Sequence, residues 1–274
     1  LSTRKWGQNL FRSQDEVSND PQLHKTNPGK GKNNLAEKLD LSFVESNPIL
    51  KEYVEAILGK DYDIILKNLV CSVPDSWVPQ WLKPRLKDAI AANLGSYIKK
   101  EYRDITYFRG LEYHLDSIDH PNEKGNHLTV YVYLNDVGMG MSPLHIVEKS
   151  YIYGATTFPH CVRNVAKKTL EYGSTDDDYR ELHWKAFTGK SGNAFSWSSF
   201  TLHGTPTQTS ETARISLRYD IKPNSLNKDS NILMNDFLEQ VLGYLSYSSS
   251  TNPHRVDLDD GMQKMKNEYR KILR

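Results

Sequence analysis

The chain has 274 residues, of which 38% are hydrophobic, 11% aromatic and 25% charged, and its 35 lysines and arginines nearly balance its 34 aspartates and glutamates. This composition excludes a largely disordered chain and lacks the basic excess that is typical of nucleic-acid-binding proteins. Two widely separated cysteines, Cys71 and Cys161, exclude a disulfide scaffold or zinc ribbon and favour a reducing compartment.

Targeting and membrane signals are absent from the sequence. No run of 18 or more apolar residues predicts a transmembrane helix, and no apolar signal segment opens the chain. We therefore expect a cytoplasmic protein without a membrane or nucleic-acid partner. The sequence leaves the oligomeric state open.

The N-terminal part of the chain changes from polar to periodic. Residues 1–40 are polar and are expected to form a loosely held arm, while residues 41–274 are expected to form one domain. Ordered structure is expected to begin near residues 46–48, where a polar cap precedes a proline at the first helical position. Apolar residues then recur at helical spacing up to Leu58, and Gly59 supplies a helix stop.

The middle of the chain predicts a strand, a helix and then many short strands. A strand is expected over 64–71 and a second amphipathic helix from Leu86 to Ile98. From Tyr107 onward, short aromatic and β-branched runs alternate with turn residues; these runs are 129–134, 195–197 and 215–219. Such punctuation predicts a mainly β fold with flanking helices, built on a sandwich or barrel.

The boundaries of this β region follow from where its pattern is interrupted. We expect its core over about 107–221 and an insertion over about 155–190, helical around Val162 to Tyr172. C-terminal helices are expected over 230–274, with one apolar helix face between Ile232 and Leu245.

A metal-binding pattern lies in this β region. In a strand, residues two apart share a face, so His114 and Asp116 can point at one metal ion. His203 follows a second strand-like run. Two imidazoles and one carboxylate on one face of an octahedron leave three positions open, an arrangement that suits non-haem Fe(II) enzymes that handle O2.

An arginine at a suitable offset completes the pattern. Arg214 lies eleven residues after His203 in the next expected strand, and its planar guanidinium can hold a dicarboxylic co-substrate by one end. Arg218 is a rival for this role, and Lys67 is a weaker one. Thr205 can hydrogen-bond the same carboxylate or serve only in a turn.

These residues resemble the phytanoyl-CoA dioxygenase family of Fe(II)/2-oxoglutarate oxygenases. The resemblance runs from about Tyr107 to Ile221 and rests on four blocks: the pair His114-x-Asp116, residues 128–137, residues 142–147, and residues 192–195 leading to His203-Gly204 and Arg214. It implies a double-stranded β-helix (jelly-roll, cupin-like) core. It also implies Fe(2+) on His114, Asp116 and His203, with 2-oxoglutarate on Arg214 and O2 as the second co-substrate.

The resemblance further implies the reaction but leaves the substrate open. The family oxidises, and most commonly hydroxylates, a C–H bond of a small organic molecule with release of succinate and CO2. The family's Pro-Gly-Ser-His turn reads Glu148-Lys149-Ser150-Tyr151 here, and Leu115 stands where relatives often carry Gln. Both departures weaken any transfer of substrate identity, and neither affects the expected iron ligands.

Other residues near the motif are weighed against ordinary structural roles. His120 and His127 are rivals for the first ligand position. Substrate contacts are expected among Tyr107, Arg109, His120, Tyr131 and Trp197, although aromatic residues on strands are more often core. A different reading is a non-catalytic ligand-binding β-helix with a structural or vestigial metal site, for which zinc would be the occupant.

Overall fold

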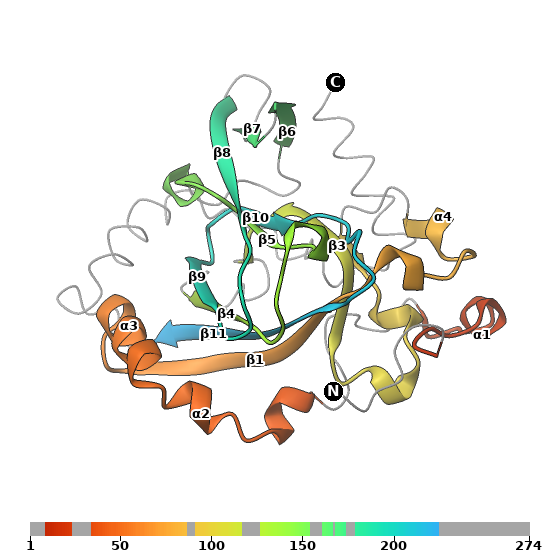
Figure 1. Cartoon of the computed structure of the whole chain (residues 1–274), viewed down its shortest axis with the longest axis horizontal. Coiled ribbons are helices and arrows are strands. Elements are labelled where there is room, and N and C mark those ends of the chain that lie inside the picture. The colour runs from red at the N-terminus through yellow and green to blue at the C-terminus, as the bar shows by residue number, and fades with distance from the viewer. Residues whose placement is uncertain are drawn as a thin grey trace.

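The mainly β class with flanking helices is confirmed by the computed structural model, which describes residues 9–23, 34–86, 91–116, 127–153, 161–166, 168–173 and 179–224 (Figure 1). The strands in this part of the chain are β1 (Tyr62–Ser72), β2 (Ala91–Asn93), β3 (Thr106–His114), β4 (Leu128–Tyr133), β5 (Leu144–Val147), β6 (Cys161–Ala166), β7 (Thr169–Gly173), β8 (Tyr179–Phe187), β9 (Ala194–Ser198), β10 (His203–Thr205) and β11 (Arg214–Pro223). The α-helices are α1 (Gln14–Ser18), α2 (Ser42–Glu45), α3 (Pro48–Leu58) and α4 (Lys83–Leu86).

The order of the strands is that of a double-stranded β-helix. Hydrogen-bonded neighbours run β6-β7-β8-β5-β10-β3-β1-β11-β4-β9, with β2 beside β3. Late strands are inserted between early ones, so that β10 lies between β5 and β3, and β11 lies between β1 and β4. Strand β3 begins parallel to β1 and ends antiparallel to β10. It thereby connects the strands β6-β7-β8-β5-β10 to the strands β1-β11-β4-β9. The predicted jelly-roll core is therefore present.

The two faces of the wall formed by β1, β11, β4 and β9 differ in chemistry. Side chains on one face pack with the N-terminal helices in a large apolar cluster that includes Leu69, Leu217 and Val54. In Figure 1, α2 and α3 lie along β1. The other face carries Thr129, which reaches the Asp116 carboxylate. We call these the outer and the inner face.

The predicted helix before β1 is confirmed in its bounds and its cap. The Asn47 side chain accepts hydrogen bonds from the backbone N–H groups of Ile49 and Leu50, and Pro48 occupies the first turn. Gly59 ends the helix with a φ of 82°, a conformation that favours glycine. The predicted strand over 64–71 is likewise confirmed within β1.

Order begins before residue 46, earlier than the sequence indicated. In the described part of the stretch expected to be a loose arm, Leu10, Phe11, Val17 and Leu23 are buried in the outer cluster. Helix α1 there has a complete capping box in which Ser13 and Glu16 satisfy each other's backbone. A few spaced apolar residues suffice to dock a polar segment. The domain boundaries themselves stay a prediction.

The helix predicted from Leu86 to Ile98 is wrong. Residues 87–90 lie outside the described residues, and from residue 91 the chain forms β2 and a short 310 turn at Gly95–Tyr97. Asn93 accepts a hydrogen bond from the Gly95 N–H with its side chain, which competes with helix formation. The Leu94 N–H instead donates to the Tyr107 carbonyl across the sheet.

The helical insertion predicted over about 155–190 is also wrong, because its described residues form the hairpins β6-β7-β8. Lys168 adopts a φ of 64° in the turn before β7, and this left-handed conformation interrupts a helix. Leu170 and Leu182 pair across the strands and are buried in a second apolar cluster. That burial outweighs local helix propensity. The predicted C-terminal helices over 230–274 lie outside the described residues.

Within the described ranges, no helix is both long and apolar enough to cross a membrane.

Candidate metal centre

Two strands bring the predicted histidines together. His203 on β10 lies directly opposite His114 at the end of β3, and opposed residues of an antiparallel pair share a face. The two rings have centroids 4.3 Å apart. Asp116 follows two residues after His114. One ligand atom from each of the three residues lies within 4.8 Å of the other two, and all three side chains are buried.

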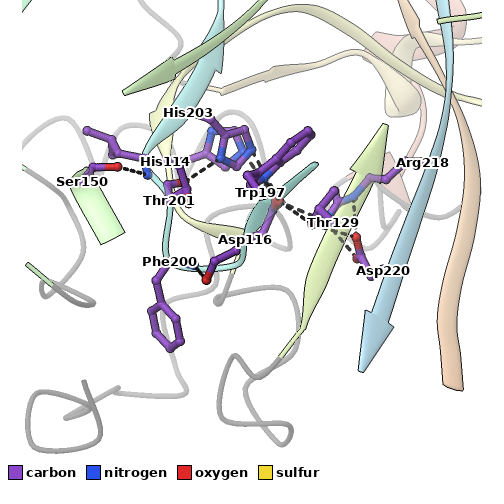
Figure 2. Close-up of polar contacts among 12 residues, drawn as sticks. His114, Asp116, Thr129, Ser150, Trp197, Phe200, Thr201, His203, Arg218 and Asp220 are labelled. Carbon is purple, nitrogen blue, oxygen red and sulfur yellow. Dashed lines mark hydrogen bonds and ion pairs between the residues drawn. The ribbon is translucent and has the colours of Figure 1, made fainter. Parts of the chain in front are cut away.

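The His203 ring is oriented by a backbone carbonyl. Its Nδ1 lies 2.9 Å from the Thr201 carbonyl oxygen, which can only accept, so Nδ1 carries the proton. The other ring nitrogen, Nε2, faces Asp116, 3.5 Å from Oδ2 (Figure 2). A carbonyl on the second ring nitrogen is the common way in which proteins orient a metal-binding histidine.

The two oxygens of Asp116 have different surroundings. Oδ2 accepts hydrogen bonds from the Thr129 hydroxyl at 3.0 Å and from the Trp197 indole N–H at 2.9 Å. Oδ1 is buried and accepts no hydrogen bond, although it lies 3.1 Å from Nη2 of Arg218 in an ion pair. Oδ1 also lies 4.0 Å from Nε2 of His114.

Asp116 is held as a carboxylate. Burial acts to raise the pKa of its carboxyl group, but the positive charges of Arg218, His203, His114 and His127 outweigh it and hold that pKa well below its usual range. A deprotonated carboxylate is the form that binds a metal ion.

These residues fit a metal ion chemically. Two imidazole nitrogens and one carboxylate oxygen converge on a common point, and the oxygen that faces His114 lacks a hydrogen-bond donor. Buried polar atoms without such a partner are uncommon in native proteins. Nitrogen and oxygen donors in this number suit Fe(II) with open positions, and they also suit zinc.

Arg214 lies on the inner face without a carboxylate partner in the described residues. Its guanidinium donates to the Ser142 carbonyl and to the Tyr131 hydroxyl, and its Nε makes no hydrogen bond. Ser72, opposite Arg214 on β1, and Ser216 each bury a hydroxyl oxygen without a hydrogen-bond partner. A buried guanidinium with unsatisfied polar neighbours is suited to receive an anion.

The rival arginine and lysine are already paired. Arg218 contacts the carboxylates of Asp116 and Asp220, with Nη2 3.1 Å from the first and 2.9 Å from the second. Lys67 pairs with Glu45 at 3.4 Å on the outer side of β1. The anion-binding role predicted for Arg214 is therefore favoured over both alternatives.

Two of the five substrate candidates lie on the wrong face of β3. Tyr107 pairs with Cys71 and is buried in the outer cluster, and Arg109 forms an ion pair with Asp75 at 2.7 Å. Both are an odd number of positions from His114, so strand alternation directs them away from it. The prediction that they contact substrate is wrong for this reason.

The remaining candidates divide between the inner face and undescribed residues. Tyr131 and Trp197 lie on the inner face with ring centroids 5.7 Å apart, and the centroid of Trp197 lies 4.9 Å from that of His203 in a tilted arrangement. Thr205 accepts a hydrogen bond from the Leu111 N–H, which gives it a structural role between β10 and β3. His120 lies outside the described residues. His127 is buried beside β4 and is not part of the three-residue cluster.

Two residues beside the His114, Asp116 and His203 cluster were not predicted from the sequence. They are Thr129 and Asp220, which share a hydrogen bond at 3.1 Å. They lie opposite each other on β4 and β11, and Trp197 lies opposite Thr129 on β9. Polar residues that alternate with buried apolar ones in both strands were the available signal.

The comparisons with known proteins are confined to solved structures. No protein-family model matches the chain, and no curated protein matches it. Among similar solved structures are EvdMO1 (15% identity, TM-score 0.40, covering 70% of this chain and 35% of that chain) and the non-heme alpha ketoglutarate dependent epimerase SnoN (14% identity, TM-score 0.44, covering 69% and 59%). A third is EctD from S. alaskensis with 2-oxoglutarate and 5-hydroxyectoine (13% identity, TM-score 0.41, covering 67% and 52%).

The chain thus spans less than two thirds of the length of each of these three proteins. At these identities and TM-scores, the likeness assigns neither a family nor an activity. The cofactors and ligands named with SnoN and EctD are properties of those proteins.

Proposed function

We propose that the protein is an Fe(II)/2-oxoglutarate-dependent oxygenase that hydroxylates a C–H bond of a small organic substrate. The observation that carries this proposal is the convergence of His114, Asp116 and His203 on one point, with the buried Arg214 on the same inner face and no carboxylate partner for it in the described residues. Membership in the phytanoyl-CoA dioxygenase family and a cytoplasmic location stay predictions.

Each residue has a distinct part in this proposal. His114, Asp116 and His203 would hold the ion, and Arg214 would bind the distal carboxylate of 2-oxoglutarate by its two-pronged guanidinium. Bound iron with 2-oxoglutarate and O2 supplies the oxidising chemistry, and succinate and CO2 are the co-products.

The rest of the inner face would orient the reactants and exclude water. Val70, Tyr133, Leu144 and Trp197 form a buried apolar cluster beside the polar site. A dry surrounding strengthens the electrostatic contacts of Arg214 with an anion. The described side chains need not act as a general base in this scheme.

The proposal is tested by two measurements on the purified protein. With Fe(II), 2-oxoglutarate and O2 it is expected to form succinate slowly even without a substrate, and without O2 it is expected to show a weak visible charge-transfer band. His114→Ala and His203→Ala are expected to abolish both signals by removing a ligand. His183→Ala, at an exposed histidine on β8, is the matched control and is expected to retain them.

Succinate formation that persists in both ligand variants would contradict the proposal. Tight zinc binding without succinate formation or a charge-transfer band would instead support a non-catalytic binding protein with a structural metal.

A further inference from the structure

The Arg218 guanidinium lies beside Asp116, the carboxylate proposed to bind the metal ion. The Arg218 side chain lies between Asp116 and Asp220, both of which are buried (Figure 2). Its Nη2 lies 3.1 Å from Oδ1 of Asp116 and 2.9 Å from Oδ2 of Asp220, and its Nε lies 2.9 Å from Oδ1 of Asp220. The guanidinium therefore makes two contacts with Asp220 and one with Asp116.

The single contact with Asp116 falls on a particular oxygen. Trp197 and Thr129 hold Oδ2, whereas Oδ1 accepts no hydrogen bond and faces His114. Arg218 thus pairs with the oxygen that is positioned for a metal ion. A carboxylate buried this deeply needs a cation near it.

Asp220 is the second carboxylate that contacts Arg218. It is fully buried two residues beyond Arg218 on β11. The Thr129 hydroxyl lies within hydrogen-bonding distance of both Asp220 and Asp116, and its single proton serves one of them at a time. The carboxylates of Asp116 and Asp220 both contact Nη2 of Arg218, and without the guanidinium between them these two buried negative charges would repel each other. Once a divalent ion shares Asp116, the stronger partner left for Arg218 is Asp220.

We propose that Arg218 is the resident counter-cation of Asp116 in the metal-free protein, and that Asp220 is a positioning residue that retains Arg218 when a metal ion takes Oδ1. This inference rests on the proposed function, because it requires that His114, Asp116 and His203 bind a metal. Metal affinity would then depend on how firmly Asp220 holds the guanidinium.

The experiment is a titration of the 274-residue chain with Co(II), followed by visible absorption, in four forms: the unmodified chain, Asp220→Asn, Arg218→Gln and the double variant. Without the Asp220 carboxylate, the guanidinium loses two of its contacts and is held more strongly by Asp116, where it competes with the metal. Asp220→Asn is therefore expected to weaken Co(II) binding on the order of tenfold. Arg218→Gln is expected to bind at least as tightly as the unmodified chain.

The double variant separates this role from a merely structural one. Removing Arg218 from the Asp220→Asn protein removes the competitor, so Co(II) affinity is expected to return to about that of Arg218→Gln, which is non-additive. Asp136→Asn, which breaks the exposed ion pair of Asp136 with Lys190 at 2.6 Å, is the matched control and is expected to leave Co(II) affinity unchanged.

Several results would overturn the inference. An Asp220→Asn protein that binds Co(II) normally, or a double variant that binds as weakly as Asp220→Asn, contradicts it. If Asp220→Asn does not fold, Arg218→Gln decides alone, because a loss of Co(II) affinity there contradicts the competition. An unmodified chain that binds Co(II) no better than a His114→Ala/His203→Ala variant refutes the proposed metal site itself.

Discussion

The two faces of β11 show how one strand serves both the core and the candidate site. Leu217, Tyr219 and Ile221 point outward into the apolar cluster beneath the N-terminal helices. The alternate residues point inward, and those that pair with β4 lie opposite polar or aromatic residues; these inward residues of β11 are Arg214, Ser216, Arg218 and Asp220. Strand alternation is the reason that neighbours in sequence have such different surroundings.

The two faces have opposite effects on the stability of the folded state. On the outer face, burial of apolar side chains stabilises the protein. Among the described residues of the inner face, the buried polar atoms without a hydrogen bond include Ser72 Oγ, Arg214 Nε, Ser216 Oγ and Asp116 Oδ1, the last of which has an ion pair with Arg218. Such atoms destabilise the folded state, and their gathering on one face marks the place where a ligand would restore their contacts.

The largest expected effect is on the free energy of unfolding, and it comes from a substitution in the apolar cluster of the outer face. Leu217→Ala removes a fully buried side chain, and we expect it to lower the free energy of unfolding by about 2 to 5 kcal/mol. Chemical denaturation of the metal-free protein measures this. Co(II) affinity is expected to stay within a factor of about three, because the inner face is unchanged. A loss of Co(II) binding in the folded variant would show that the two faces are not independent.

The next effect comes from the inner face. Arg214→Met keeps an unbranched apolar stem and removes the charged guanidinium group, so 2-oxoglutarate loses its proposed anchor. We expect its dissociation constant, measured by the anaerobic charge-transfer band, to rise by about a hundredfold. The stability of the ligand-free protein is expected to change by less than about 1 kcal/mol, because removal of a buried charge offsets the lost hydrogen bonds to Ser142 and Tyr131. Unchanged 2-oxoglutarate binding would remove Arg214 from the site.

The smallest effect concerns a polar residue on the opposite face from His203. His145 lies opposite Gly204, stacks on Trp184 with centroids 4.1 Å apart, and has a buried Nε2 without a hydrogen bond. Burial, with a smaller contribution from Arg214, lowers the pKa of His145 from 6.5 to about 4.

The unfolded chain therefore binds a proton at His145 at higher pH than the folded protein does. The stability that depends on neutral His145 is complete above the unfolded pKa of 6.5 and is lost progressively as the pH falls toward 4. We expect this loss to be on the order of 1 to 3 kcal/mol. In His145→Phe, stability measured by denaturation at pH 7 and at pH 5 is expected to differ less than in the unmodified chain. An equal difference would contradict the burial of this imidazole.

Much of the convergence of His114, Asp116 and His203 could be predicted from sequence, because the pattern is local or depends on strand type. His114 and Asp116 are two apart in a strand, and His203 follows a separate strand-like run. The cap at Asn47 and the stop at Gly59 likewise depend on their immediate neighbours. Predictions of this kind agreed with the structure.

Predictions failed where local preference and tertiary packing disagree. Residues 162–172 have helical spacing, yet pairing with β8 makes them a hairpin. Tyr107 and Arg109 lie close to the motif in sequence, but the parity of β3 turns them outward. Arg214 and Arg218 share one strand face. The offset from His203 favoured Arg214 as the anion-binding residue, but it did not show which carboxylates each arginine contacts.

By itself, the sequence determined the residue types that can bind a metal, their alternation along strands, and the mainly β class. The tertiary structure decided which distant strands became neighbours: β10 beside β3, and β11 between β1 and β4. That pairing placed Arg218 between two carboxylates and left Arg214 without one in the described residues. The physical reason is that charge pairing and burial depend on distances between strands, which a local pattern does not encode.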